Sequence, residues 1–304
     1  MNIKNFSFVL LPVVFVPDVM AATMMPGIQL EGALGLLNGS STELVYNDGK
    51  KLSQLDWEIE NVPIIKLGAT WDVNEQLTFK GGLWSVMNDD GDAHMEDRDW
   101  LTPNQSSPSD ISIHPDTKLR NAYEIDFNAT YWLAINSNYR MGALVGYQYN
   151  QFKWDGIGGT YRYDNGADVG AFSNIVVIDY KQEFQVFYLG FAGEYNIDRS
   201  DFFAQVKWSP LVDAKDVDNH RLRNLTFYEQ SNGGSDFVSL TLNYGYNFTP
   251  RAKLYAEYVY TVYEEAKADT TLVNNTTGQV SYSPNSAGLD NENSTVSVGI
   301  KLIF

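Results

Sequence analysis

The sequence predicts an all-β protein, a ten-stranded antiparallel transmembrane β-barrel with short periplasmic turns and long extracellular loops. Three observations predict this fold. Apolar and polar residues alternate with a period of two along many segments, short polar turns alternate with long polar loops, and the chain begins with a segment typical of secretory signals. Residues 22–304 are expected to form a single barrel domain.

The N-terminal residues 1–21 have the features of a secretory signal peptide. Lys4 precedes the apolar run 6–16, Pro17 interrupts that run, and Ala21 supplies the small residue expected before a cleavage site. The apolar run is shorter than the roughly 20 residues that a transmembrane helix needs. A removable signal is therefore expected here rather than a membrane anchor.

The clearest strand pattern closes the chain, where every second residue from Val296 to Phe304 is apolar. The same alternation occurs in residues 125–131, 202–208 and 238–246. Because successive side chains of a strand point to opposite faces, this pattern predicts half-buried strands. No long pattern with a helical period interrupts them, and the aromatic Phe304 suits an assembly signal for outer-membrane barrels.

Four short polar turns divide the chain at nearly even intervals. They lie at residues 72–75, 136–138, 196–199 and 249–251. The strands between them are joined in pairs by longer loops rich in Gly, Asn, Asp and Ser, at residues 40–51, 88–120, 152–174, 210–235 and 266–292. Four turns and five loops make ten strands, and the asymmetry is typical of outer-membrane barrels. A soluble β-sandwich is the alternative, because alternation alone does not show whether the apolar side chains face outward to lipid or inward to a core.

The composition excludes several classes of protein. The chain has 38 Asp and Glu against 21 Lys and Arg, and its net charge of −17 argues against nucleic-acid binding, which requires a basic surface. It has no cysteine, so disulfides, thiolate nucleophiles and cysteine-ligated metals are excluded.

Acidic residues and histidines concentrate in the predicted extracellular loops. The second loop contains an Asp-x-Asp-Trp motif at residues 97–100, and the fourth contains an Asp-x-Asp-x-His motif at residues 216–220. All three histidines, His94, His114 and His220, fall in predicted loops. Solvated charge explains any single acid, but the two motifs together suggest groups that converge over one barrel mouth.

Such a chain could have any of four functions at this point, and one of them is that of a glycosidase, which would use a pair of carboxylates. A metal-dependent hydrolase would use the histidines with nearby carboxylates, although the chain lacks a His-Glu-x-x-His motif. A serine hydrolase is disfavoured because no Gly-x-Ser-x-Gly motif is present. From a different class, a non-enzymatic barrel such as a pore or an adhesin would also carry charged loops.

Four motifs in the mature chain match those of a known family in order and spacing. They are KLSQLDW at residues 51–57, MEDRDW at 95–100, HPDT at 114–117 and DNH at 218–220. In these motifs the chain resembles the omptin family, outer-membrane endoproteases with a ten-stranded barrel. The resemblance covers essentially the whole mature chain. It implies a bacterial outer-membrane location with the active site facing the extracellular side.

The resemblance implies an aspartic-type endopeptidase in which water attacks the peptide bond without an acyl-enzyme. The residues of the family that match Asp218 and His220 form a dyad whose imidazole is the general base. Those that match Asp97 and Asp99 form an acidic couple on the opposite side of the cleft, and the attacking water lies between couple and dyad. Histidine suits the role of base because its ordinary pKa of about 6.5 is close to the working pH.

The resemblance also implies a substrate preference. Glu43 and Asp216 match acidic residues that hold an Arg or Lys side chain next to the cut, and Met95 and Ile178 match apolar walls around the stem of that side chain. Asp110 matches an acidic group that faces the residue after the cut. Basic peptides and proteins, cut preferably between two basic residues, are therefore the expected substrates.

Omptins need lipopolysaccharide, which binds to the outer wall of the barrel. This chain has Tyr149 and Gln151 where the family motif carries an acid and an arginine, Glu183 where another motif carries an arginine, and no lysine near 231–233. Lipopolysaccharide binding is therefore either rebuilt with other residues or weaker. No metal, no other cofactor and no nucleic acid are expected to bind, and the protein is expected to be a monomer.

Overall fold

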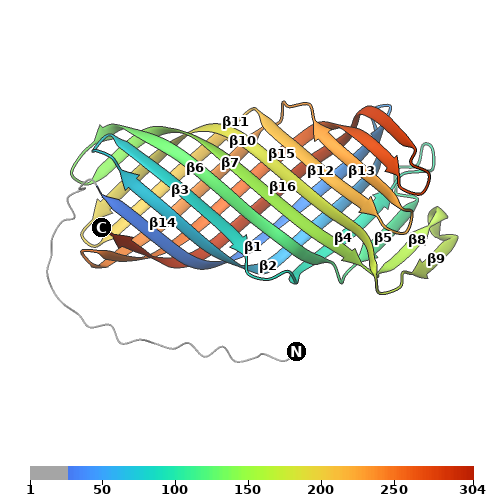
Figure 1. Ribbon diagram of the computed structural model, residues 1–304, viewed down its shortest axis with the longest axis horizontal. Coiled ribbons are helices and arrows are strands. Elements are labelled where there is room, and N and C mark those ends of the chain that lie inside the picture. Colours follow the sequence, from blue (N-terminus) through green and yellow to red (C-terminus); the bar gives the residue numbers. More distant parts are fainter. Residues whose placement is uncertain (1–26) are drawn as a thin grey trace, which may run out of the picture.

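The computed structural model describes residues 27–304, which form one antiparallel sheet that closes into a long barrel (Figure 1). The ring closes where β16 (Val280–Ile303) pairs with β1 (Ile28–Asn47) along most of its length. The predicted all-β barrel is confirmed. The predicted signal peptide, residues 1–21, lies outside the described residues.

The sheet contains sixteen strand segments. Besides β1 and β16 they are β2 (Lys50–Asp72), β3 (Leu77–Val86), β4 (Gly91–Asp99), β5 (Asp110–His114), β6 (Lys118–Ile135), β7 (Tyr139–Ile157), β8 (Thr160–Tyr163), β9 (Asp168–Ala171), β10 (Val176–Ile197), β11 (Ser200–Ser209), β12 (Val212–His220), β13 (Leu225–Ser231), β14 (Phe237–Thr249) and β15 (Ala252–Asn274). A short 3₁₀ turn, η1 (Asp164–Gly166), lies between β8 and β9. Residues 27–304 include no helix that is long and apolar enough to cross a membrane.

Ten strands run around the ring, because four of them are each built from two segments. β3 and β4 both pair with β2, β11 and β12 both pair with β10, and β13 and β14 both pair with β15. β5 and β6 both pair with the β3–β4 strand. The other six, β1, β2, β7, β10, β15 and β16, are continuous, and β8 and β9 form a hairpin that extends β5. The prediction of ten strands is confirmed.

The four short turns are also confirmed, whereas the predicted loops are wrong in extent. β1 and β2 meet at a two-residue turn, Asp48-Gly49, whose φ angles of 51° and 75° are those of a tight hairpin. β2 and β15 contain 23 residues each, against the roughly 10 that cross a bilayer. Beyond the membrane a strand need not be apolar on its outer face, so the strands continue through sequence that reads as polar loop.

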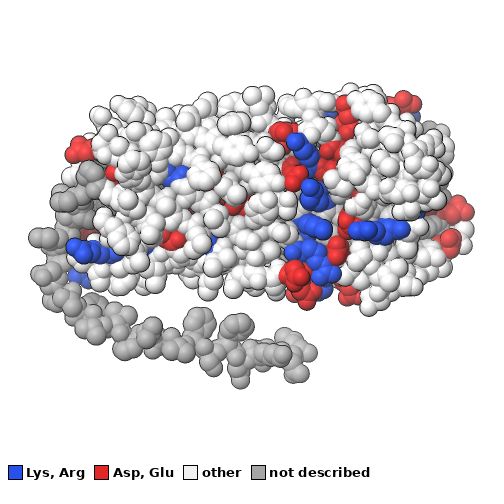
Figure 2. Space-filling view, in the orientation of Figure 1, with Lys and Arg blue, Asp and Glu red and all other residues white. Residues whose placement is uncertain are grey.

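Two zones of the barrel differ in surface. The zone near the C-terminus carries outward-facing apolar side chains, such as Leu34, Phe127, Phe187 and Val298, each more than half exposed. Figure 2 shows this zone with few charges, and a band of Lys, Arg, Asp and Glu where it ends. The apolar zone is the lipid-facing belt of an outer-membrane barrel. The zone beyond the band lies outside the membrane.

The interior of the barrel is filled by side chains. Ion pairs join opposite walls in the membrane zone, such as Lys207 with Asp126 at 2.7 Å. Above them lies an aromatic cluster, in which the ring of Tyr180 stacks on Trp57 at a centroid distance of 5.2 Å and on Trp154 at 5.7 Å. All three rings are fully buried. This cluster closes the interior and provides the floor of the extracellular end.

Candidate active site

The predicted catalytic residues lie on two strands at the end of the barrel away from the C-terminus (Figure 1). Asp97 and Asp99 lie on β4, and Asp218 and His220 lie on β12. Their prediction as loop residues is wrong, because the hydrogen-bonded ladder continues through both segments. Alternate residues of a strand share a face, so the two members of each pair point the same way.

Asp218 and His220 form a close pair. Oδ2 of Asp218 lies 2.6 Å from Nε2 of His220, and Asp218 is 1% exposed. The imidazole also packs edge-on against Phe227, with 5.2 Å between ring centroids. The carboxylate and the aromatic ring together fix the orientation of the imidazole, with Nε2 next to Asp218.

Asp97 and Asp99, predicted to be an acidic couple, lie two residues apart on β4 with their side chains on the same face. The Ser53 hydroxyl donates a hydrogen bond to Oδ1 of Asp97 at 3.3 Å. Burial raises the pKa of Asp97 well above its ordinary value, and the charge of Asp99 raises it further; burial raises the pKa of Asp99 as well. Two partly buried carboxyls side by side disfavour double ionisation, so the couple keeps a proton to higher pH than an isolated Asp.

Arg223, which the sequence did not single out, connects the couple and the dyad. Its guanidinium contacts Nδ1 of His220, and its positive charge opposes the burial-driven rise in the pKa of Asp97 and Asp99. It comes from the turn 221–224 between β12 and β13. In the sequence Arg223 is marked only by its position three residues after His220. That spacing does not predict that the turn folds back over the imidazole ring.

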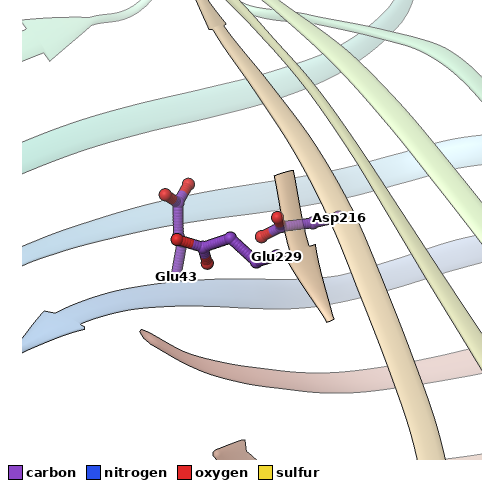
Figure 3. Close-up of side chains that lie close together, drawn as sticks. All are labelled: Glu43, Asp216 and Glu229. Atoms are coloured by element: carbon purple, nitrogen blue, oxygen red, sulfur yellow. The ribbon is translucent and has the colours of Figure 1, made fainter. Parts of the chain in front are cut away.

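Glu43 and Asp216, the residues matched to the cation pocket, come together next to a third carboxylate, that of Glu229 (Figure 3). Each offers an oxygen within 4.8 Å of the other two, and each residue is 2% exposed. Glu43, expected in a loop, lies within β1 and pairs with both β2 and β16. Glu229 lies on β13, in a predicted loop where the sequence defines no side-chain direction, and was therefore missed.

Burial dominates the acid–base chemistry of this pocket. It raises the pKa of Glu43 well above its ordinary value, and the charge of Asp218 raises it further. Burial also raises the pKa of Asp216 well above its ordinary value, and the charge of Glu229 raises it further. Burial raises the pKa of Glu229 to about 8. At neutral pH the three carboxyls therefore hold at least one proton among them.

Tyr180, which donates a hydrogen bond to Asp216, connects this pocket to the two residues predicted as its apolar walls, Met95 and Ile178. Met95 and Ile178 are buried in the same apolar cluster as Trp57 and Tyr180. Met95 lies directly opposite Trp57 across β4 and β2, and Ile178 lies opposite His220 across β10 and β12. The three carboxylates and the neighbouring apolar cluster together suit a long side chain with an aliphatic stem and a cationic end.

Asp110 lies beside the couple, directly opposite Asp99 across β4 and β5. Its two oxygens accept hydrogen bonds from the Ser109 hydroxyl at 2.6 Å and from the backbone N–H of Asp164 at 2.8 Å. Asp110 thus anchors the β8–β9 hairpin at the edge of the site and adds negative charge next to Asp99.

The structure does not support a histidine metal site. His114 is buried, with Nδ1 bonded to the carbonyl of Gly158 at 2.6 Å and Nε2 to the Ser112 hydroxyl at 3.0 Å. Burial lowers its pKa, and both ring nitrogens are already used. Within residues 27–304, the group with metal-ligand spacing is Glu43, Asp216 and Glu229, which includes no histidine.

The chain is similar to several known proteins. Residues 25–304 match the sequence model described as the Omptin family. The chain is 40% identical over 274 residues to the plasminogen activator of Yersinia pestis, covering 89% of this chain and 87% of that protein. It is 35% identical to the outer membrane protease OmpP of Escherichia coli, covering 96% of each. The crystal structure of the outer membrane protease OmpT from Escherichia coli superposes with a TM-score of 0.88 at 32% identity, covering 94% of this chain and 100% of that one.

Proposed function

Because this chain belongs to the omptin family, we propose that it is an outer-membrane endopeptidase that cleaves peptides and proteins at basic, preferably dibasic, sites. The chain is an outer-membrane barrel, and the candidate site lies at its extracellular end. One observation carries the proposal: Arg223 contacts the Asp218–His220 pair and acts on the charges of the Asp97–Asp99 couple, so the two pairs lie close together.

The proposed mechanism is of the aspartic type, with water as the nucleophile. Asp218 holds Nε2 of His220, so Nδ1 takes the proton of the attacking water and later gives it to the leaving amine. The couple, which retains one proton, holds the same water from the other side and hydrogen-bonds the oxyanion that forms. Arg223 contacts Nδ1 in this structure, so it moves aside when the water and substrate are in place.

The proposed specificity follows from the three-carboxylate pocket and its walls. Glu43 and Asp216 pair with the Lys or Arg side chain on the N-terminal side of the cut, while Met95 and Ile178 pack against its aliphatic stem. Asp110, beside Asp99, attracts a second basic side chain after the cut. The net charge of −17 makes approach of cationic substrates favourable and sensitive to salt.

For the lipid, the structure favours a rebuilt site on the outer wall. Lys153 lies directly opposite Lys181 across β7 and β10, and Lys215 follows on β12, opposite Glu183. All three lysines point outward, between buried neighbours. Lys181 pairs with Glu183 at 3.3 Å and Lys215 with Asp213 at 3.8 Å, whereas Lys153 faces the positive charge of Lys181, which is unfavourable unless a further anion lies there. We therefore propose that they bind lipopolysaccharide phosphates near the edge of the membrane, and that the barrel acts as a monomer.

The test is hydrolysis of a fluorogenic peptide centred on Arg-Arg by protein refolded with lipopolysaccharide. His220→Ala and the double change Asp97→Ala/Asp99→Ala are each expected to lower kcat at least 100-fold. Glu58→Gln, on the exposed outer face of β2, is the matched control and is expected to retain activity. Unchanged turnover in the His220 or couple variants, with the barrel folded by circular dichroism, would refute the mechanism.

A further inference from the structure

The three carboxylates of the pocket come from strands that are far apart in sequence. Glu43 lies on β1, Asp216 on β12 and Glu229 on β13. Figure 3 shows the three side chains close together, with those of Glu229 and Asp216 extending toward Glu43. Such convergence of like charges in a buried position is costly unless the carboxyls take up protons or a cation is bound there.

Each carboxylate keeps one oxygen without a hydrogen-bond donor. Oε2 of Glu43, Oδ1 of Asp216 and Oε2 of Glu229 are buried and accept no hydrogen bond within the described chain. The other oxygens of two of them are occupied, because Tyr180 donates to Oδ2 of Asp216 at 3.0 Å and Thr270 donates to Oε1 of Glu229 at 2.9 Å. These contacts hold the carboxylates in place while leaving three oxygens for a ligand.

We propose that Glu43, Asp216 and Glu229 form a binding site for a single divalent cation of the Ca²⁺ type. Two oxygens on one Ca²⁺, at 2.3–2.6 Å each, lie at most about 5 Å apart. The three carboxylates each offer an oxygen within 4.8 Å of the other two, which fits this span. Mg²⁺ usually keeps several of its waters and is bound by only one or two carboxylates, so a buried site made of three carboxylates suits Ca²⁺ better. Zn²⁺ prefers nitrogen and sulfur ligands, which the pocket does not offer among its described residues.

The metal site overlaps the pocket proposed for the basic side chain of the substrate. An ion held by Glu43 and Asp216 occupies the charges that would otherwise pair with Lys or Arg. Ca²⁺ is therefore a competitive inhibitor that raises KM and leaves kcat unchanged. This competition rests on the proposed function, whereas the binding of the ion does not.

The binding test uses the full mature chain refolded in detergent without lipopolysaccharide, because lipid phosphates also bind Ca²⁺. Calorimetric titration with Ca²⁺ alone is expected to give one site per chain, with Mg²⁺ at least tenfold weaker. Glu229→Gln keeps the side-chain size and is expected to raise the Kd for Ca²⁺ at least tenfold. Glu264→Gln, an exposed acid on β15, is the control and leaves the Kd unchanged.

A Tb³⁺ titration gives a second readout, because Tyr180 contacts Asp216 and its excitation sensitises Tb³⁺ bound nearby. Absence of saturable Ca²⁺ binding, or an equal Kd for wild type and Glu229→Gln, overturns the metal site. If Glu229→Gln does not fold, equal affinity of wild type for Ca²⁺ and Mg²⁺ overturns the assigned ion. If Ca²⁺ binds but KM does not rise, the metal site stands, and the assignment of this pocket to the basic side chain of the substrate is wrong.

Discussion

The guanidinium of Arg223 contacts Nδ1 of His220, the ring nitrogen that faces away from Asp218. The same guanidinium acts on both carboxyls of the Asp97–Asp99 couple. One side chain therefore connects the two halves of the candidate site. In this position it covers Nδ1 of His220. Its charge also keeps the pKa values of Asp97 and Asp99 lower than burial alone would set them.

The first prediction concerns the pH profile of Arg223→Ala. Loss of the positive charge leaves burial unopposed, so the pKa of the couple rises and the acid limb of kcat/KM moves to higher pH. We expect activity about tenfold below wild type at pH 5.5 and at or above wild type at pH 8, where Nδ1 is uncovered. Arg221→Ala is the control, since Arg221 is exposed and pairs with Asp179. A parallel drop at every pH would argue against this role.

The second prediction concerns Glu43→Gln. Removing one charge from a buried ion pair costs about 2 kcal/mol or more, so kcat/KM for Arg-Arg peptides is expected to fall at least 30-fold. A peptide with a neutral residue before the cut should lose much less. Steady-state kinetics on the two peptides measure the loss of kcat/KM for each, and Glu58→Gln serves as the control. Equal losses on both peptides would mean that Glu43 supports the fold and not the specificity.

The third prediction concerns the outer wall. In Lys153→Gln/Lys181→Gln the phosphate-binding charges are lost, so about tenfold more lipopolysaccharide is expected to be needed for half-maximal activity. Lys50→Gln, exposed beside the β1–β2 turn, is the control. The measurement is peptide hydrolysis against added lipopolysaccharide at two salt concentrations. A wild-type response retained by the double variant would place the lipid elsewhere.

The fourth prediction concerns the floor of the site. Trp57 is fully buried and stacks on Tyr180, so Trp57→Ala is expected to lower the free energy of unfolding by about 3–5 kcal/mol. Trp57→Phe keeps a ring in the stack and should lose clearly less. Urea unfolding followed by circular dichroism measures both. Similar losses in the two variants would show that bulk, and not stacking, matters at this position.

The sequence predicted the barrel and the turns well because lipid imposes a regular pattern there. Val296 and Phe304 belong to a strand whose outer face must be apolar, so alternation is visible. Glu43 and Asp97 lie on strands beyond the lipid, where both faces are polar and no alternation marks the strand. Their placement in loops was wrong for that reason, although the family motifs identified them as candidate site residues.

Glu229 and Arg223 show what a pattern along the chain does not contain. Glu229 enters the pocket because β13 pairs with β12 and β15 in one particular register. A shift of that register by one residue would turn it outward. Arg223 reaches His220 through the path of a four-residue turn. Neither register nor turn path is encoded by residue type alone.

The short turn 136–138 divides the chain into two halves, and the barrel assembles the site from both. The first half carries Glu43, Asp97 and Asp99, and the second carries Asp216 and His220. Neither half possesses a base, an acidic couple and a cation pocket together. The proposed site is therefore complete only when strands from both halves have paired around the ring and β16 has closed on β1.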